Sequence, residues 1–402
     1  MRLFATLGPG DIVAAQRKEL SGARFVQGAS QTHSGQLYRY CGLKGISALF
    51  VSYSPNADSL DTPWVRFVNL PRRWNDAGGW RFHCGRILYA IKLARMARAF
   101  RADLALIDSG TAHYFALAVF RLLNVPIAVN FHNVRWPQGF GPRGRMGAVV
   151  RALDSWFFRR VAVAAMGCSP ECGEQARADG ASGLPYFGWC AQYDPDGFTP
   201  DAVDPVRVPF RVLFSGRVER EKGVFDLIEI AARLRKQCRI PVRIDVCGNG
   251  RALEELRAAV AAGGYGECIS FHGHLQRAEL LEAYKRAHAI IVPTRSGFCE
   301  GMPLVCAEAV LSGRPVVTSR ISNVLPVIGA AVAEAQPDDP PSYVSAIRRL
   351  AEDGRHYEAL QSACASVARQ FLEPERGYTA AVDRLMAVVC RGSQGDSGPS
   401  SG

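Results

Sequence analysis

Two clusters of polar residues follow apolar runs in the second half of the chain. The first is the turn Ser215-Gly216-Arg217-Val218-Glu219-Arg220-Glu221-Lys222-Gly223, which precedes an amphipathic helical pattern. Arginine offers a planar fork to phosphate oxygens, lysine offers a mobile charge, and the start of a helix adds free N–H groups. Gly216, Arg217 and Lys222 therefore suit a diphosphate. The alternative is a surface turn in which the two cations pair with Glu219 and Glu221.

The second cluster places two carboxylates eight residues apart, at Glu300 and Glu308. Glu308 shares one face of a predicted buried helix with Leu304 and Leu311, so we expect it to point into the interior. A buried carboxylate needs a polar partner to offset its desolvation. The hydroxyls of a bound ribose would serve. An internal partner, such as Arg295 or a backbone N–H group, is the alternative.

The turn before that helix is Glu300-Gly301-Met302-Pro303. Proline suits the first turn of a helix, and Gly301 lets the backbone approach a ligand closely. Because Pro303 has no N–H group, the candidate donors to sugar hydroxyls or phosphate oxygens are the backbone N–H groups of Gly301, Met302 and Leu304.

Smaller features lie elsewhere in the chain. Gly8-Pro9-Gly10-Asp11 follows the first apolar run, and we expect a loop there that reaches the ligand; a plain turn is the alternative. His132 ends another apolar run, and ligands bind outside the carboxyl ends of such strands. Asp194-Pro195-Asp196 has the spacing of a metal-binding Asp-x-Asp motif, but it lies in an irregular stretch. We interpret it as a turn and predict no metal.

Alternating elements must position these residues. In the first half, strand-like runs occupy 2–8, 46–54, 102–110, 126–133 and 161–169, and helical patterns occupy 84–100, 113–123 and 146–160. In the second half, strand-like runs occupy 211–216, 242–248, 268–273, 289–294 and 315–320, and helical patterns occupy 224–237, 251–261, 277–287, 303–312 and 341–352. This order predicts an α/β protein with two doubly wound, Rossmann-like parallel sheets facing across a cleft.

Composition suggests where the domains divide. Residues 183–209 are rich in Pro, Gly, Asp and aromatic residues without periodicity, which indicates an inter-domain connection. We predict an N-terminal domain over 1–190, a linker over 191–209, a C-terminal domain over 210–372, a helix over 373–390 that returns to the N-terminal domain, and a disordered tail over 391–402.

Bulk composition excludes some classes of protein. A chain of 402 residues with 48% apolar and 21% charged residues can bury two cores and is not disordered. The twelve cysteines lack a regular framework, which predicts reduced thiols in a cytoplasmic protein. No apolar run is long enough to span a membrane. The net charge of +11, with basic stretches at 81–101 and 135–160, would attract phosphate-bearing partners, including an anionic membrane.

The spacing Glu300-x7-Glu308, with Gly216-Arg217 and Glu221-Lys222-Gly223 upstream, resembles family 4 of the retaining glycosyltransferases, which adopt the GT-B fold. The likeness runs from about residue 210 to residue 352. It includes Gly248-Asn249-Gly250, Phe271-His272-Gly273-His274-Leu275 and the segment from Tyr284 to Thr294. The Glu-Gly-Met-Pro form departs from the commoner form, which has Phe-Gly after the first glutamate. The first domain resembles the family only loosely, as is usual for the acceptor-binding half, so the resemblance implies that residues 1–190 bind the acceptor and residues 210–372 bind the nucleotide sugar.

The resemblance implies roles for individual residues. Arg217 and Lys222 would hold the donor diphosphate and stabilise the leaving group. Glu300 and His132 would contact the transferred sugar, and Glu308 would bind the ribose hydroxyls. The nucleotide-sugar site implied in this way comprises Gly10, Gly216, Arg217, Lys222, Gly248, Gly273, Leu275, Gly301, Met302, Leu304 and Glu308.

The sequence therefore predicts a retaining, metal-independent hexosyltransferase that needs no cofactor. Its donor would be a nucleotide-diphosphate sugar and its acceptor a glycan or a lipid-linked glycan, in cell-surface polysaccharide or glycolipid assembly. We expect it in the cytoplasm, peripheral to the inner face of the plasma membrane. The alternatives are a nucleotide-sugar epimerase, which the Glu300-x7-Glu308 spacing disfavours, and a non-catalytic nucleic-acid-binding protein. No recognised RNA- or DNA-binding module is visible, so we predict no nucleic-acid partner.

Overall fold

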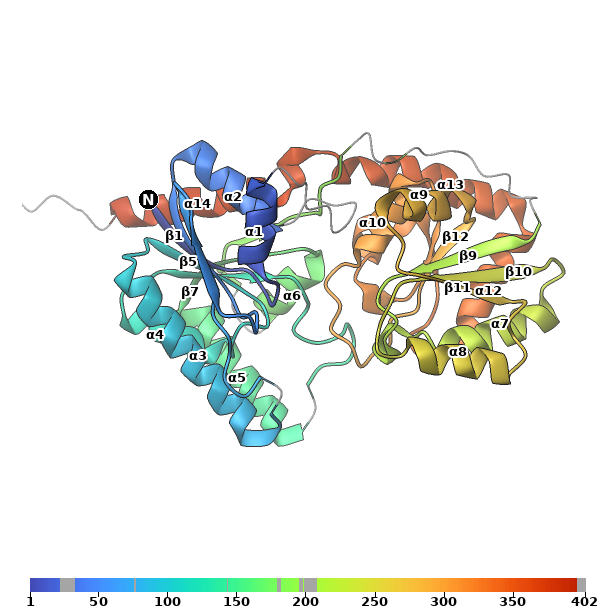
Figure 1. The fold of residues 1–402 in the computed structure, drawn as a ribbon, viewed down its shortest axis with the longest axis horizontal. Coiled ribbons are helices and arrows are strands. Elements are labelled where there is room, and N and C mark those ends of the chain that lie inside the picture. The colour runs from blue at the N-terminus through green and yellow to red at the C-terminus, as the bar shows by residue number, and fades with distance from the viewer. Residues whose placement is uncertain are drawn as a thin grey trace, which may run out of the picture.

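The computed structural model describes residues 1–21, 33–75, 77–142, 144–178, 182–194, 198 and 208–395. Figure 1 shows two α/β bodies side by side, each built around its own sheet. This agrees with the predicted fold of two parallel-sheet domains. Among the described residues, no helix is long and apolar enough to cross a bilayer.

The first sheet has the strand order β3-β4-β2-β1-β5-β6-β7-β8 in the described part of the chain. Its strands are β1 (Arg2–Thr6), β2 (Ser47–Ser52), β3 (Asp58–Asp61), β4 (Val65–Asn69), β5 (Leu104–Asp108), β6 (Ile127–Phe131), β7 (Ala162–Gly167) and β8 (Tyr186–Gly188). β3 pairs antiparallel with β4, and the remaining pairs are parallel. β5 and β6 are buried along their whole length, because helices cover both faces of the sheet.

The helices of this domain lie on the two faces of its sheet (Figure 1). They are α1 (Ile12–Leu20), α2 (His33–Lys44), α3 (Gly79–Ala99), α4 (Val119–Leu122), α5 (Gly144–Arg160) and α6 (Pro170–Ala178), with the 3-10 turn η1 (Phe115–Ala118). β8 lies inside the stretch that we expected to be irregular. It pairs with β7, so the first sheet continues into that stretch.

The second sheet is parallel, in the order β11-β10-β9-β12-β13-β14. Its strands are β9 (Phe210–Ser215), β10 (Val242–Cys247), β11 (Ile269–Gly273), β12 (Ala289–Val292), β13 (Val316–Thr318) and β14 (Val332–Glu334). Its helices are α7 (Asp226–Gln237), α8 (Leu253–Ala262), α9 (Arg277–Arg286), α10 (Leu304–Leu311), α11 (Leu325–Ile328), α12 (Pro340–Glu352) and α13 (Gly354–Ala368), with short 3-10 turns η3 (Arg220–Lys222) and η4 (Arg320–Ser322).

Both sheets reverse their strand order beside the strand that comes first in the chain. β1 lies between β2 and β5, and β9 lies between β10 and β12. In open α/β sheets, the loops at this switch point diverge and leave a crevice for ligands. The loops after β1 and β5 in the first domain, and after β9 and β12 in the second, are therefore the places where chemistry is expected.

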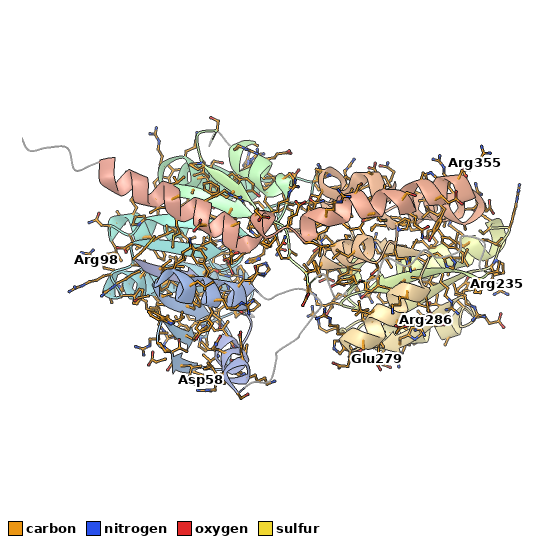
Figure 2. The ribbon with its side chains drawn as sticks, turned by 90° about the horizontal axis from the view of Figure 1, so that it is seen from above. Asp58, Arg98, Arg235, Glu279, Arg286 and Arg355 are labelled. Atoms are coloured by element: carbon orange, nitrogen blue, oxygen red, sulfur yellow. The ribbon has the colours of Figure 1, made fainter. Side chains whose placement is uncertain are left out.

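The last helix, α14 (Tyr378–Gly395), packs against α2, β7 and β8 of the first domain. Tyr378, Leu385 and Met386 are buried in the same apolar core as β1. Figure 2 shows the two final long helices end to end along one side of the molecule. α14 continues through residues 391–395, so the expectation that these residues are disordered is wrong. Once a helix is nucleated, each added residue gains a backbone hydrogen bond, so a helix can extend beyond its apolar pattern. Residues 396–402 of the predicted tail lie outside the described residues.

Candidate functional site

The turn after β9 is built by close contact between two loops. A Cβ atom on Gly248 would lie 1.8 Å from the carbonyl oxygen of Gly216. The two loops could therefore not lie this close together with a side chain at residue 248. The Gly216 N–H group donates to Cys247 O at 3.0 Å, and the Val218 N–H group donates to Asn249 O at 2.9 Å. These contacts fix the backbone that presents Arg217.

Lys222 is directed from the same turn to the loop after β12. The following residue, Gly223, has φ 73°, and a Cβ atom there would lie 2.0 Å from Pro293 O. Lys222 Nζ forms an ion pair with Glu300 Oε2, and the Thr294 hydroxyl donates to the same oxygen at 3.3 Å. The alternative pairing of this lysine with Glu219 or Glu221 is therefore wrong.

Arg217 is exposed, and its guanidinium makes no ion pair or side-chain hydrogen bond with the described residues. Glu219, a proposed partner, pairs with Arg251 at 3.4 Å instead. The end of β9 thus carries one cation held by a carboxylate and one that faces solvent. Both lie at the switch point of the second sheet.

Glu308 is buried, with 8% of its surface exposed, and has an internal partner. The Tyr284 hydroxyl donates to Glu308 Oε2 at 2.7 Å. Burial raises the pKa of the Glu308 carboxyl, although the Tyr284 hydrogen bond and the charge of Arg277 oppose that shift. Arg295 is not the partner, since it pairs with Asp226 at 2.9 Å.

The neighbours of Glu308 on its helix differ from the expectation in one respect. Leu311 is buried, but Leu304 is 44% exposed. Helix α10 begins at Leu304 with Pro303 as the capping residue, so Leu304 lies at the open end of the helix and faces the space between the domains.

The turn at Glu300 and Gly301 is docked onto the first domain. The Val134 N–H group donates to Glu300 O at 3.2 Å, and Asn323 Nδ2 donates to the same oxygen at 2.8 Å. A Cβ atom on Gly301 would lie 1.8 Å from His132 O. The close approach at Gly301 is therefore to the backbone of the other domain.

His132 follows β6 and is held by polar partners from its own domain. Its Nε2 atom lies 3.0 Å from Asp108 Oδ1 and 2.9 Å from Asn130 Nδ2. Burial would lower the pKa of the imidazole, but the charge of Asp108 and the hydrogen bond to it raise that pKa above its ordinary value. Trp189 Nε1 donates to Asn130 Oδ1 at 3.0 Å and so orients the amide. Sequence reasoning missed Asp108, Asn130 and Trp189, although Asp108 lies near the end of the predicted strand 102–110, which precedes that of His132 in the chain.

A cavity of about 160 Å³ between the domains brings several predicted residues together. Its walls come from both domains, with His132 and Trp189 on one side and Met302 and Leu304 on the other. His33 of α2 also lines it, and its ring centroid lies 4.9 Å from that of His132. Burial and the nearby His132 lower the pKa of His33 to about 3.

Gly273 is the last residue of β11 and Leu275 follows it, at the same edge of the sheet. Gly273 O accepts a hydrogen bond of 2.7 Å from the Gly248 N–H group, which joins the loops after β10 and β11. Leu275 is half-buried against the apolar core around α9 and α10.

Gly10 lies in the loop after β1 and is exposed, with no heavy atom within 4 Å of a Cβ atom built on it. The adjacent Asp11 caps α1 by accepting from the Ala14 N–H group at 2.8 Å. The Gly-Pro-Gly-Asp sequence therefore ends a strand and starts a helix. Among the described residues, the hydrogen bonds of this segment stay within the first domain.

Within the described residues, no group of three or more His, Cys, Asp and Glu side chains could hold a metal ion. The Asp-x-Asp motif cannot be placed, because Pro195 and Asp196 lie outside the described residues.

Both halves of the chain match models of known protein families. Residues 205–367 match the family model for group 1 glycosyl transferases, and residues 28–185 match that for a glycosyl transferase 4-like domain. A glycogen synthase of Mycobacterium tuberculosis is 25% identical over 346 residues, covering 81% of this chain and 78% of the relative. A D-inositol 3-phosphate glycosyltransferase of Catenulispora acidiphila is 31% identical over 199 residues, covering 47% of this chain and 46% of the relative.

Solved structures share the fold at low identity. The trehalose 6-phosphate synthase of Burkholderia multivorans has a TM-score of 0.73 at 12% identity, covering 100% of this chain and 99% of that one. The Anabaena protein HepE, solved with UDP-glucose, has a TM-score of 0.62 at 15% identity, covering 98% of this chain and 100% of that one. The second half of the chain thus belongs to the group 1 glycosyl transferases and the first half to the glycosyl transferase 4-like domains. With both halves matched and the two-sheet architecture in place, the chain is a glycosyltransferase with the GT-B fold, and its reaction is sugar transfer from a nucleotide sugar.

Proposed function

We propose that this protein is a retaining hexosyltransferase that moves a sugar from a nucleoside-diphosphate sugar to a glycan or lipid-linked acceptor in cell-surface polysaccharide or glycolipid assembly. The observation that carries the donor half of this proposal is the Lys222–Glu300 ion pair, which joins the ends of β9 and β12 at the switch point of the second sheet. The exposed Arg217 lies on the same turn as Lys222, and the buried Glu308 lies on the helix that follows Glu300. Retention of configuration rests on the family resemblance of the Glu300-x7-Glu308 spacing.

The two cations would act on the diphosphate. Sugar transfer develops negative charge on the departing diphosphate, and fixed cations stabilise that state more than the ground state. A diphosphate that reaches Lys222 competes with Glu300 for its ammonium group. Glu300 then becomes an acceptor for hydroxyls of the transferred sugar. Arg217 and Lys222 together supply positive charge that a divalent ion would otherwise bring, so we propose a metal-independent transfer that needs no cofactor.

Glu308 would receive the ribose. Tyr284 occupies Oε2, and ribose hydroxyls are neutral donors that can satisfy a buried carboxylate without a second charge. The loops at Gly216, Gly248, Gly273 and Leu275 would surround the nucleotide. The backbone of Gly301, Met302 and Leu304 would meet the diphosphate or the sugar.

On the side of the first domain, His132 would contact the transferred sugar. Its imidazole lines the cavity between the domains together with Met302 and Leu304, and Asp108 raises its pKa. A protonated ring would donate to sugar oxygens. We also propose that the loop at Gly10 closes towards the donor and acceptor when both are bound.

Thermal unfolding with UDP, GDP and ADP, and with their common sugar conjugates, tests the donor site. A ligand that binds the folded state raises its melting temperature. We expect one nucleoside diphosphate to stabilise the wild type and to lose most of that effect on Glu308→Ala. Tyr284→Phe is the matched control, because it removes the internal partner but keeps the carboxylate. If no nucleotide shifts the wild type, the proposed donor site is wrong.

A second part of the proposal concerns a membrane. Exposed apolar side chains lie on α3 and α5, among them Trp80 (68% exposed), Met146 (75%) and Val149 (53%). α3 has no acidic residue, and the acid of α5, Asp154, is buried. Basic residues flank this surface, so it complements an anionic bilayer. We propose peripheral binding at the cytoplasmic face of the plasma membrane.

Flotation with vesicles tests the membrane contact. We expect the protein to float with vesicles that contain anionic lipid and to stay behind with purely zwitterionic ones. Met146→Glu should weaken flotation, whereas Leu43→Glu, a change at an exposed leucine of α2, should not. Equal recovery with both kinds of vesicle would contradict this part of the proposal and leave the donor site untouched.

A further inference from the structure

The turn that follows β13 contacts the turn that carries Glu300. Asn323 lies at the end of the 3-10 turn η4 in this segment and is buried, with 2% of its surface exposed. Its Nδ2 atom donates to Glu300 O at 2.8 Å and to Gly301 O at 3.2 Å. One side-chain amide thus holds two successive carbonyl groups of the loop between β12 and α10.

The orientation of the Asn323 amide follows from these two contacts. Carbonyl oxygens only accept hydrogen bonds, so the nitrogen of the amide must face them. The amide oxygen, Oδ1, is buried and has no hydrogen-bond partner among the described residues. A buried acceptor without a partner lowers the stability of the fold. Residue 323 therefore keeps its two hydrogen bonds to the loop at a cost in stability, as residues at functional sites often do.

The backbone around Asn323 gives its side chain a fixed starting point. Asn323 has φ 57° and ψ 17°, a left-handed conformation that asparagine adopts more readily than most residues. Its N–H group donates to Arg320 O at 3.0 Å, and the Ser322 hydroxyl donates to Ser319 O at 2.8 Å. These bonds close a buried turn at the end of β13, from which the amide reaches the neighbouring loop.

The carbonyl that Asn323 holds is also bound by the first domain. Glu300 O accepts from the Val134 N–H group, in the loop after β6, at 3.2 Å. The same loop packs on η4, since the Arg320 Cζ atom lies 5.9 Å from the centroid of the Phe140 ring. The backbone of Glu300 is therefore fixed from the second domain by a side-chain amide and from the first domain by a peptide N–H group.

The carboxylate of Glu300 is restrained as well. Its Oε2 atom forms the ion pair with Lys222 and accepts the hydrogen bond from Thr294. A carboxylate held at its backbone and at one oxygen presents the other oxygen in a defined direction. Binding groups for a reacting substrate need such restraint, because small displacements weaken their contacts.

We propose that Asn323 is a positioning residue for Glu300: its amide fixes the backbone from which the carboxylate meets the sugar part of the donor. This inference rests on the proposed function, in which Glu300 contacts the transferred sugar and Arg217, Lys222 and Glu308 hold the nucleoside diphosphate. Loss of the amide therefore weakens the contribution of the sugar to binding and preserves that of the nucleoside diphosphate.

Titration calorimetry measures the two contributions separately. The probes are UDP, GDP and ADP, each compared with a sugar conjugate: UDP-glucose, GDP-mannose and ADP-glucose. Asn323→Gly keeps the left-handed backbone and removes the amide. For the nucleotide that binds the wild type, we expect this variant to bind the sugar conjugate about tenfold more weakly, the effect of losing one hydrogen bond to a charged group. The nucleoside diphosphate should bind as in the wild type.

A second variant and a control make the comparison specific. Asn323→Asp keeps the size of the side chain but places a carboxylate against two carbonyl oxygens, so it should weaken binding of the sugar conjugate more than Asn323→Gly does. Asn124→Gly makes the same change at an exposed asparagine of the first domain, which has φ 55°. This control should bind both ligands like the wild type.

Hydrogen exchange of the unliganded protein tests the positioning without any donor. In Asn323→Gly, amides of residues 299–306 should exchange several-fold faster, because the loop loses two of its hydrogen bonds. Amides of β9 should keep the protection that they have in the wild type. If Asn323→Gly melts early, the same two measurements are made on Asn323→Asp.

Two results would overturn the inference. One is unchanged exchange at residues 299–306 in Asn323→Gly. The other is an affinity for the sugar conjugate that stays at the wild-type level, or that falls only as far as the affinity for the nucleoside diphosphate. Failure of the wild type to bind any nucleotide, together with the expected change in exchange, would contradict the proposed function and leave the positioning of Glu300 by Asn323 supported.

Discussion

Lys222 and Glu300 neutralise each other across the ends of β9 and β12, with their side chains 16% and 9% exposed. Replacing one member of such a buried pair lowers the stability of the folded state, because the remaining charge has no partner. The pair therefore has two separable roles, one in stability and one in the proposed transfer. Substitutions can distinguish these roles.

Lys222→Gln should lower kcat on the order of 100- to 1000-fold, the effect expected when a donor to a developing negative charge is lost. It should also lower the melting temperature, because Glu300 keeps its buried charge. The double change Lys222→Gln with Glu300→Gln should recover stability but not rate. Lys236→Gln, at an exposed position on α7, is the control. Normal kcat in Lys222→Gln would exclude the lysine from the reaction.

The histidine at the domain boundary makes a prediction about pH. The pKa of His132 is higher in the folded than in the unfolded protein. Its pairing with Asp108 therefore stabilises the fold fully below about pH 6.5, the pKa of an unfolded histidine, and this stabilisation disappears as pH rises through the folded pKa. His33 has the opposite sign: its lowered pKa makes stability fall as pH drops below the same value. NMR titration of the ring protons separates the two.

We expect the His132 resonance to titrate above its ordinary pKa in the wild type and lower in Asp108→Asn, which keeps the hydrogen-bond acceptor but removes the charge. His33 should stay neutral across the range in both proteins. An unchanged His132 midpoint in Asp108→Asn would show that Asp108 does not set this pKa.

Single residues also show what the sequence can reveal. The spacing of Glu308 and Leu311 was enough to predict a buried carboxylate, because a helical period fixes which residues share a face. The partner, Tyr284, could not be predicted, because the contact depends on how α9 packs against α10. The same holds for Asp108 beside His132, which only the parallel pairing of β5 and β6 brings together.

At the scale of elements, the loop between β12 and α10 joins the two domains through its backbone. Gly301 fits because it has no side chain where His132 O approaches. Any residue other than glycine must push the loop and the first domain apart.

Gly301→Ala should therefore lower kcat on the order of 100-fold, as expected when reacting groups are displaced by about 1 Å. Nucleotide binding should persist, because Arg217, Lys222 and Glu308 all lie in the second domain. Gly297→Ala is a matched control in the same loop, where an added Cβ atom meets nothing within 4 Å. Calorimetry with the nucleotide and steady-state rates measure the two effects separately. Wild-type kcat in Gly301→Ala would show that the close contact between Gly301 and His132 O does not affect catalysis.

Some helices and strands are easier to predict from the sequence than others. β5 and β9 were predictable because strands covered on both faces are continuous apolar runs. The edge strand β3 was missed, since its sequence Asp-Ser-Leu-Asp is polar and half-exposed. α2 was also missed: its alternation of small and polar residues gives only a weak amphipathic pattern.

At the scale of the whole molecule, the chain crosses between the domains twice. α14 follows the second domain in sequence but completes the core of the first. The Tyr40 hydroxyl donates to Asp383 at 2.9 Å, which links α2 to this returning helix. The stability of the first domain therefore depends on residues more than 300 positions away.

Leu385→Ala should destabilise the first domain by about 2–5 kcal/mol, the usual cost of a cavity at a fully buried leucine. Leu372→Ala, at a leucine that is 37% exposed, should change stability by about 0.5 kcal/mol or less. Chemical denaturation measures the free energy of unfolding, and hydrogen exchange of the native protein shows which amides lose protection. Loss of protection in β9 and β10 in place of β6 and β7 would contradict this assignment of α14.

The returning helix also sets an order for folding during synthesis. Domains tend to fold as they emerge from the ribosome, beginning with the N-terminal one. Here the second domain is nearly contiguous in sequence, whereas the first lacks Tyr378, Leu385 and Met386 of its core until the ribosome has translated the second. The nascent chain must therefore hold an incomplete first domain, with apolar surface open to chaperones, until synthesis of the helix that closes it.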